Sequence, residues 1–450
     1  MTIRYHSIPS DEFGALAAGG GGQAAVRRLV AAQYSKRLAL LLGMLDAGKA
    51  AEGDQASQAR DAYNLLLAAY QHRPQAVAAV IRYPAVGAWA RHLLTARDMR
   101  AVAARWSAAA PAWLSTVAAT AAVRAGLTAR IEVPAVDGMV FLPSLGAAVT
   151  GARGSAVLRS TADGTEIRSA GRRVMVPPDP REEGPGWLPV REIRAGTLHA
   201  LLDDLDPFRM PAGQPLTPRL STAEAAGWTA VLREGWSRLP STAEAEIRET
   251  VSAVVPCGIP PGGSSMSQTS PHVFGAIAMS LPSDPWNCAE TLVHEGAHLK
   301  LFAVTDIVTL TVPDDGRRYY APWRDDPRPV AGLLQGAYAF LAVAGFWRHH
   351  REAAVPAVQS RACTEFARWR SGAALVAQTL LQSAQLTAHG LEFVQGMANT
   401  LTAWLAEPVP SDAMQAARSA ADAHLARWES RNGPLPDSQR LIMSRWPGRP

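Results

Sequence analysis

The run Leu292–Phe302 reads LVHEGAHLKLF and places two histidines four residues apart. In an α-helix, residues four apart point in nearly the same direction, so His294 and His298 would present their imidazoles side by side. The apolar residues around them favour a buried helix, and Ser283-Asp284-Pro285 is typical of a helix start. Buried ionisable groups are costly unless they are coordinated. The spacing therefore predicts a metal held by both histidines, and the alternative is two half-exposed histidines on an ordinary helix.

Two histidines do not complete a metal site, because a catalytic zinc has three protein ligands and one open position. A third histidine six residues further on is absent, since that position is Val304. The next helix, predicted over Val330–His350, carries Gln335, and a helix that turns back could return this residue to the metal. Asp306 is the nearest downstream carboxylate, but two turns past His298 it is better placed to cap the helix. The sequence leaves the third ligand open, with Gln335 as our candidate.

Glu295 lies between the two histidines and is the candidate catalytic residue. One step along the helix from His294, it could reach a water or a substrate on the metal. In a metal-dependent peptidase it would act as the general base. In an oxidising enzyme it would be a ligand, a neighbour of the ligands or a group that handles protons.

The segment Asp314–Pro329 has an unusual composition, with four arginines, three aromatic residues and four acids in sixteen residues. Arginine suits two-point recognition of a carboxylate. A loop beside a metal with guanidinium groups to spare could therefore hold an anionic co-substrate. The alternative is a self-contained loop, in which its own acids pair with its arginines.

The rest of the chain predicts three contiguous regions. Residues 1–128 show helical spacing of apolar residues. Residues 129–220 have short apolar runs split by glycine and proline, with Asp163-Gly164 as a hairpin turn, and predict a small antiparallel β region. Residues 221–450 return to helical spacing after the capping pattern Ser221–Glu224 and would form the metal-binding catalytic region. The expected fold is mainly α with a small antiparallel β region (α+β), with a zincin-like HExxH helix in a helical C-terminal domain.

Composition excludes several classes of protein. The 450 residues are 48% hydrophobic and 18% charged, which is not a disordered composition. The net charge of +5 comes from 44 basic and 39 acidic residues that are interspersed, so we expect no nucleic-acid partner. Cys257, Cys288 and Cys363 are odd in number and far apart, which predicts no disulfide framework and fits a reducing cytoplasm. We see no signal peptide and no apolar run of about 18 residues, and we expect a cytoplasmic protein without a membrane.

Several stretches together resemble the HExxH-motif family found beside radical-SAM peptide maturases. The stretches that carry this resemblance are Gln33–Leu38, Phe274–Ala278, Glu290–Leu301, Arg318–Pro329 and Leu333–Tyr338. That family is similar to iron- and 2-oxoglutarate-dependent β-hydroxylases of ribosomally made peptides. The resemblance implies iron(II) at His294 and His298, and Arg324 or Arg328 as the partner of the 2-oxoglutarate carboxylate. It also implies a precursor peptide as substrate and a radical-SAM maturase as a partner.

The resemblance has one departure, because many relatives carry bulkier residues where this chain has Gly296-Ala297. The small pair would leave more room beside the metal and affect the choice of substrate. The leading hypothesis is an iron(II)- and 2-oxoglutarate-dependent oxygenase that β-hydroxylates a side chain of a precursor peptide. The second is a zinc metallopeptidase of the HExxH type that cleaves a peptide or leader, and the third is a non-catalytic peptide-binding scaffold.

Overall fold

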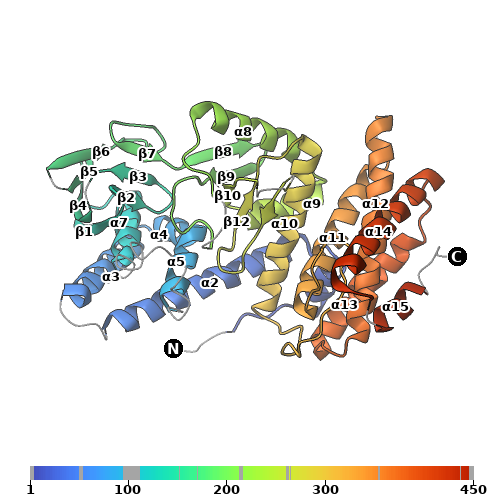
Figure 1. The fold of residues 1–450 in the computed structure, drawn as a ribbon. Helices are drawn as coiled ribbons and strands as arrows, with labels where there is room; N and C mark the ends of the chain where they lie inside the picture. Colours follow the sequence, from blue (N-terminus) through green and yellow to red (C-terminus); the bar gives the residue numbers. More distant parts are fainter. Residues whose placement is uncertain are drawn as a thin grey trace. The chain divides into compact units, whose positions relative to one another are not determined.

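The computed structural model describes residues 5–49, 54–94, 112–151, 153–169, 171–211, 216–259, 263, 265–352, 355–435 and 437–444. As predicted, the fold is mainly helical with a small β part (Figure 1). Part of the predicted N-terminal helical region, residues 95–111, lies outside the described residues.

The chain forms two compact units that are discontinuous in sequence. We call them the helical unit (Met1–Ala32, Gly235–Thr250 and Asp284–Pro450) and the mixed unit (Gln33–Glu234 and Val251–Ser283). This division differs from the three contiguous regions expected from the sequence. Two features account for the difference: the first helix of the chain packs on a C-terminal helix, and residues 253–279 supply strands to a sheet begun before residue 202.

The helical unit is a set of antiparallel helices built around two long ones. Its elements are α1 (Ser10–Ala17), the start of α2 (Gly22–Lys49), α9 (Ser241–Thr250), α10 (Pro285–Thr305), α11 (Val330–His350), α12 (Pro356–Gln382), α13 (Ala388–Leu405), α14 (Ser411–Asn432) and α15 (Asp437–Ser444). Helix α11 packs against α10 on one side and α12 on the other, and α12 also packs against α13 and α14. The fully buried side chains of Trp347, Phe366 and Phe393 lie in this core.

Helix α11 corrects one expectation from the sequence. By length and composition it is apolar enough to cross a membrane, although no such run was expected. However, 67% of its apolar stretch is buried inside the protein. A buried core helix can be as long and as apolar as a membrane-spanning helix. We therefore interpret α11 as the centre of the helical unit.

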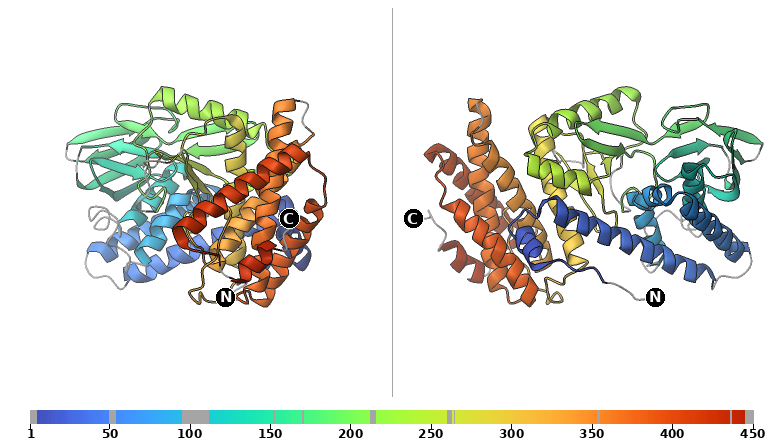
Figure 2. Two further views of the ribbon diagram at one scale, coloured as in Figure 1. Left: turned by 45° about the vertical axis from the view of Figure 1, so that its right-hand side comes forward. Right: turned by 180° about the vertical axis from the view of Figure 1, so that it is seen from behind.

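The mixed unit combines short helices with three small sheets. Its helices are the rest of α2, α3 (Asp54–His72), α4 (Pro74–Ile81), α5 (Pro84–Leu94), α7 (Trp113–Ala125) and most of α8 (Thr222–Trp236). Its strands are β1 (Ala129–Ala135), β2 (Met139–Leu142), β3 (Gly146–Val149), β4 (Gly154–Thr161), β5 (Gly164–Ser169), β6 (Arg172–Val176), β7 (Trp187–Pro189), β8 (Arg191–Ala195), β9 (Leu198–Leu202), β10 (Ala253–Pro256), β11 (Ser267–Gln268) and β12 (Ala276–Met279). Helices α3 and α7 pack against each other and against β1 (Figure 2).

The sheets confirm the predicted hairpin and add parallel pairing. Strands β4 and β5 are antiparallel around Asp163-Gly164, in a sheet of order β1-β4-β5-β6. A second sheet, β2-β3-β7, is also antiparallel. The third, β11-β12-β10-β9-β8, is mixed, because β10 runs parallel to both β9 and β12. Parallel neighbours need long connections, and the short apolar runs in the sequence did not reveal them.

One buried arginine ties together two of the stretches that carry the family resemblance. Arg37 on α2 donates to the backbone carbonyls of Ile81, Arg82 and Phe274. Burial lowers its pKa to about 10. Carbonyl acceptors thus stabilise a buried guanidinium and hold Gln33–Leu38 beside the strand that begins at Ala276.

Candidate metal centre

Helix α10 begins as its sequence predicts. The side chain of Asp284 accepts hydrogen bonds from the backbone N–H groups of Trp286 (2.8 Å) and Asn287 (2.9 Å), and Pro285 occupies the first turn. Most of the helix is buried. A stripe of partly exposed side chains recurs every three or four residues along it, and it consists of Asn287, Glu290, His294, His298 and Phe302. Both candidate ligands therefore lie on a partly exposed face of α10.

The two histidines point their Nε2 atoms at each other. These atoms are 3.2 Å apart. Two nitrogens at this separation, each about 2.0–2.1 Å from one ion, would subtend an angle of about 100° at it, between the octahedral and tetrahedral values. Burial, with a smaller contribution from His298, lowers the pKa of His294 to about 3. His294 is therefore neutral near pH 7, which is the form that binds metals.

Gln335 contacts the other nitrogen of His298 and not the pair of Nε2 atoms. Its Oε1 lies 3.1 Å from His298 Nδ1. Helices α10 and α11 run antiparallel, so the predicted return of Gln335 to the histidines takes place. Nδ1 and Nε2 lie on opposite sides of the imidazole ring, and an ion bound by the Nε2 atoms would be remote from this contact. The geometry therefore favours Gln335 as a group that orients His298, and not as the metal ligand that the sequence suggested.

Aromatic rings surround the histidines on the exposed side. The Phe340 ring centroid lies 4.9 Å from that of His294, and Phe340 stacks on Trp369 (4.1 Å) and is tilted against Trp323 (4.6 Å). Trp323 comes from the loop between α10 and α11 and lies over Gly336, where a Cβ would come within 2.4 Å of its Nε1. The loop therefore reaches the candidate centre through its tryptophan, and glycine at 336 makes the approach possible.

Glu295 lies off the exposed stripe. Its side chain is 2% exposed, whereas both histidines are partly exposed. The next two residues, Gly296 and Ala297, line a cavity of about 350 Å³ together with Ile247 of α9. A further lining residue of this cavity is Lys300, which forms a 2.5 Å ion pair with Glu246. The space beside the small pair is therefore on the side of α10 that faces α9.

The loop arginines pair with acids of their own loop. Arg324 Nε and Arg328 Nη1 each lie 2.9 Å from one oxygen of Asp326, which bridges them. Arg317 and Arg318 pair in the same way with Asp315 and Asp314. Of the two interpretations from the sequence, the self-contained loop describes this structure. The role of Arg324 and Arg328 toward a carboxylate co-substrate stays a prediction.

Charged side chains of α12, which sequence reasoning missed, lie near the histidine stripe. Arg361, Glu365 and Arg368 form a partly exposed face of α12. Burial first, and then Glu365, raise the pKa of Glu290 to about 7, while Arg361 and Arg368 oppose the rise. The four charges are thus close enough to interact. The spacing of Glu290 four residues before His294 was visible in the sequence, but its neighbours on α12 were not.

Within the described ranges, no three His, Cys, Asp or Glu side chains come together as a metal-binding group. The two-histidine pair nevertheless fits a borderline metal such as iron(II) or zinc in donor type and spacing. A metal there would have two protein ligands from α10, and its remaining positions would be filled by water or by bound reactants.

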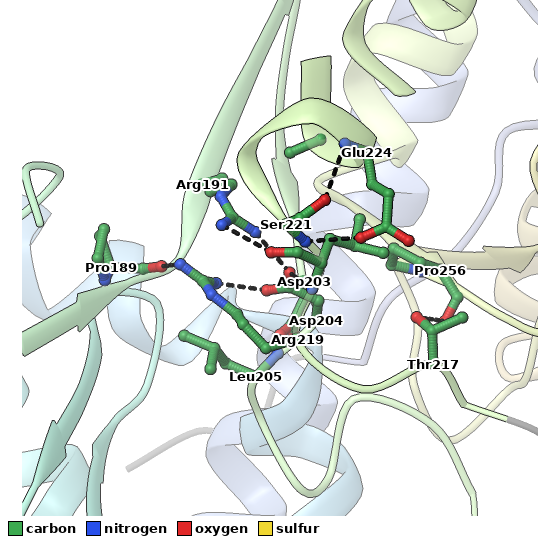
Figure 3. A network of polar contacts seen from close by, with 12 residues as sticks. Pro189, Arg191, Asp203, Asp204, Leu205, Thr217, Arg219, Ser221, Glu224 and Pro256 are labelled. Carbon is green, nitrogen blue, oxygen red and sulfur yellow. Dashed lines mark hydrogen bonds and ion pairs between the residues drawn. The ribbon is translucent and has the colours of Figure 1, made fainter. Parts of the chain in front are cut away.

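The mixed unit contains a second buried charged network, which we interpret as structural (Figure 3). Asp204, just after β9, accepts from Arg191 Nη1 (2.7 Å), Arg219 Nη1 (2.5 Å) and the backbone N–H of Leu220 (3.0 Å). Each carboxylate oxygen thus has a partner within the protein. This network fixes the turn after β9.

Comparison with known proteins adds no assignment: no protein-family model matches the chain, and no curated protein matches it.

Proposed function

We propose that the protein is an iron(II)- and 2-oxoglutarate-dependent oxygenase that hydroxylates a side chain of a ribosomally made precursor peptide at its β-carbon. The observation that carries the proposal is the two-histidine pair with Gln335 behind it. Oxygenases of this kind use two histidines, often with a carboxylate, and keep positions open for reactants. A zinc hydrolase uses three protein ligands. Because both kinds of site commonly have a third protein ligand, the absence of a third His, Cys, Asp or Glu beside this pair among the described residues does not separate the two functions.

His294 and His298 would hold the iron, which when bound would supply the oxidising chemistry. Gln335 Oε1 would accept a hydrogen bond from His298 Nδ1–H and leave Nε2 free to coordinate. The stack of Trp323, Phe340 and Trp369 would exclude water from one side of the reacting centre. The substrate peptide and a neighbouring radical-SAM maturase remain proposals that rest on the family resemblance, as does the cytoplasmic location.

Glu295 distinguishes the proposal from the zinc metallopeptidase. Since its side chain is buried and lies off the exposed stripe, we propose that it supports α10 from behind and does not contact the reacting atoms. In a peptidase it would be the general base, and Glu295→Gln would abolish activity. In the oxygenase, Glu295→Gln would retain part of the hydroxylation.

The test combines metal binding with product analysis. We expect His294→Ala and His298→Ala each to lose bound iron(II) while remaining folded. The wild type, given iron(II), 2-oxoglutarate, oxygen and the small peptide encoded beside its gene, should produce succinate and a peptide heavier by one oxygen atom. Zinc-dependent cleavage of that peptide without oxygen or 2-oxoglutarate would replace the proposal with the peptidase. Full metal occupancy in either histidine variant would place the metal site elsewhere.

A further inference from the structure

Two arginines of α12 lie near the histidine stripe, and only one of them is held tightly. Arg361 donates to Asn287 Oδ1 at 2.6 Å, approaches Asp284 Oδ1 at 3.7 Å and lies 4.9 Å over the Trp347 ring. It thereby ties the start of α12 to the start of α10. For Arg368, the ion pair within the described residues is with Glu365, at 4.0 Å. This separation exceeds hydrogen-bond length, so the donors of Arg368 can be recruited by a ligand.

Arg368 is connected to the histidines through stacked rings. Its guanidinium lies 4.2 Å from the centroid of Trp369. Trp369 stacks on Phe340, and Phe340 contacts His294. A guanidinium on a ring face keeps its N–H groups at its edges, directed outward, and they match both oxygens of a carboxylate. Its side chain is 36% exposed, so a solute can reach it.

A second, independent observation at the same place points to a missing acceptor. Trp369 is 8% exposed, and its Nε1 is a buried donor with no acceptor among the described residues. A buried donor without a partner is costly. A ligand oxygen that reached the edge of this ring would supply the acceptor. Arg324 and Arg328, in contrast, already share Asp326 at 2.9 Å.

We propose that Arg368, with the indole N–H of Trp369, binds the distal carboxylate of the dicarboxylate co-substrate, and that Arg324 and Arg328 do not. This inference rests on the proposed function. Glu290 and Glu365 add negative charge to the same face, which opposes an anion. Burial raises the pKa of Glu290 to about 7, and its protonated form reduces that cost because it carries no charge.

The experiment measures binding of 2-oxoglutarate, without turnover, to the iron(II)-loaded protein under anaerobic conditions by titration calorimetry. Arg368→Gln should weaken 2-oxoglutarate about tenfold to a hundredfold, because a charge-assisted contact is lost. Iron(II) affinity should not change. Trp369→Phe, which keeps a ring and removes the N–H, should weaken binding by a few-fold. The matched control, Arg324→Gln with Arg328→Gln, should bind 2-oxoglutarate as the wild type does.

A second ligand separates this contact from general damage to the site. 2-Oxobutyrate lacks the distal carboxylate, so Arg368→Gln should bind it as tightly as the wild type. Equal loss for both ligands would overturn the assignment, as would a loss confined to the loop double variant. Should Arg368→Gln fail to fold, Arg368→Lys keeps the charge without the two-point contact and should show the same selective loss. A wild type that binds iron(II) but no 2-oxoglutarate would reject the proposed function itself.

Discussion

Replacing Gln335 with alanine tests the geometry of the candidate centre most directly. Gln335 Oε1 lies 3.1 Å from His298 Nδ1, while His298 Nε2 faces His294 Nε2 at 3.2 Å. Because an amide oxygen can only accept, the contact with Gln335 favours the tautomer of His298 that carries its proton on Nδ1 and leaves the lone pair of Nε2 available. Without this contact, the proton can move to Nε2, where it blocks coordination. Gln335→Ala should therefore weaken metal binding without unfolding the protein.

The magnitude follows from the kind of contact that is lost. A neutral hydrogen bond contributes about 1 kcal/mol net to stability. Loss of a partner that orients a metal-bound histidine costs about tenfold to a hundredfold in metal affinity, which corresponds to about 1.4–2.7 kcal/mol. Gln335→Glu keeps an oxygen acceptor and makes it stronger, so its metal affinity should equal or exceed that of the wild type.

Cobalt(II) titration followed by visible absorption measures both affinity and coordination. We expect Gln335→Ala to give the cobalt spectrum of the wild type at a higher metal concentration. Gln395→Ala, a matched change at an exposed glutamine of α13 that contacts Asn399, should change neither. A different spectrum for saturated Gln335→Ala would make Gln335 a ligand, as the sequence suggested. Unchanged affinity would refute the orienting role.

Three further changes test other parts of the structure. Lys300→Met leaves the buried carboxylate of Glu246 without its 2.5 Å partner, so the free energy of unfolding measured in urea should fall by about 3–5 kcal/mol. Adding Glu246→Gln should recover much of that loss. Gly336→Ala places a Cβ 2.4 Å from Trp323 Nε1 and should therefore displace the tryptophan. A red-shifted fluorescence spectrum would reveal this displacement, and an unchanged spectrum would contradict the close approach. Burial and a neighbouring acid raise the pKa of Asp206 to about 8. Because the folded protein binds the Asp206 proton more tightly than the unfolded chain does, this proton stabilises the fold. The stabilisation is fully present below the unfolded-state pKa near 3.9 and is lost as the pH rises toward 8. Asp206→Asn should therefore be more stable than the wild type by about 1 kcal/mol or more at pH 8–9, with a smaller difference at pH 5, and equal stability at both pH values would contradict the shift.

Local patterns in the sequence predicted the features that depend on nearby residues. The cap at Asp284 and the pairing of His294 with His298 follow from helical spacing, since residues four apart share a face whatever surrounds the helix. The hairpin at Asp163-Gly164 and the capping contacts between Ser221 and Glu224 (2.7 and 3.2 Å) follow from turn and cap chemistry in the same way.

Features that depend on distant packing could not be predicted in this way. The sequence placed Gln335 on the next helix, but which imidazole nitrogen it contacts depends on the rotation of α11 against α10. Loop composition did not decide whether Arg324 and Arg328 were available, because Asp326 lies within reach of both only in the folded turn. Arg368 lies 70 residues beyond His298, and the stacking of Trp369 on Phe340 that brings it toward the histidines is a tertiary contact.

The HExxH run alone does not separate hydrolysis from oxidation, because both chemistries can use two histidines one helical turn apart. We propose that the surroundings of the pair distinguish them. A hydrolase of this type needs a glutamate that reaches the metal-bound water. Here Gln335 lies behind His298, and Glu295 is buried off the stripe that carries the histidines. An oxygenase needs open metal positions and a cation for its acidic co-substrate, and we propose Arg368 on the neighbouring helix for the second role. Besides Glu295, the residues on which this proposal rests lie outside the motif, on α11 and α12.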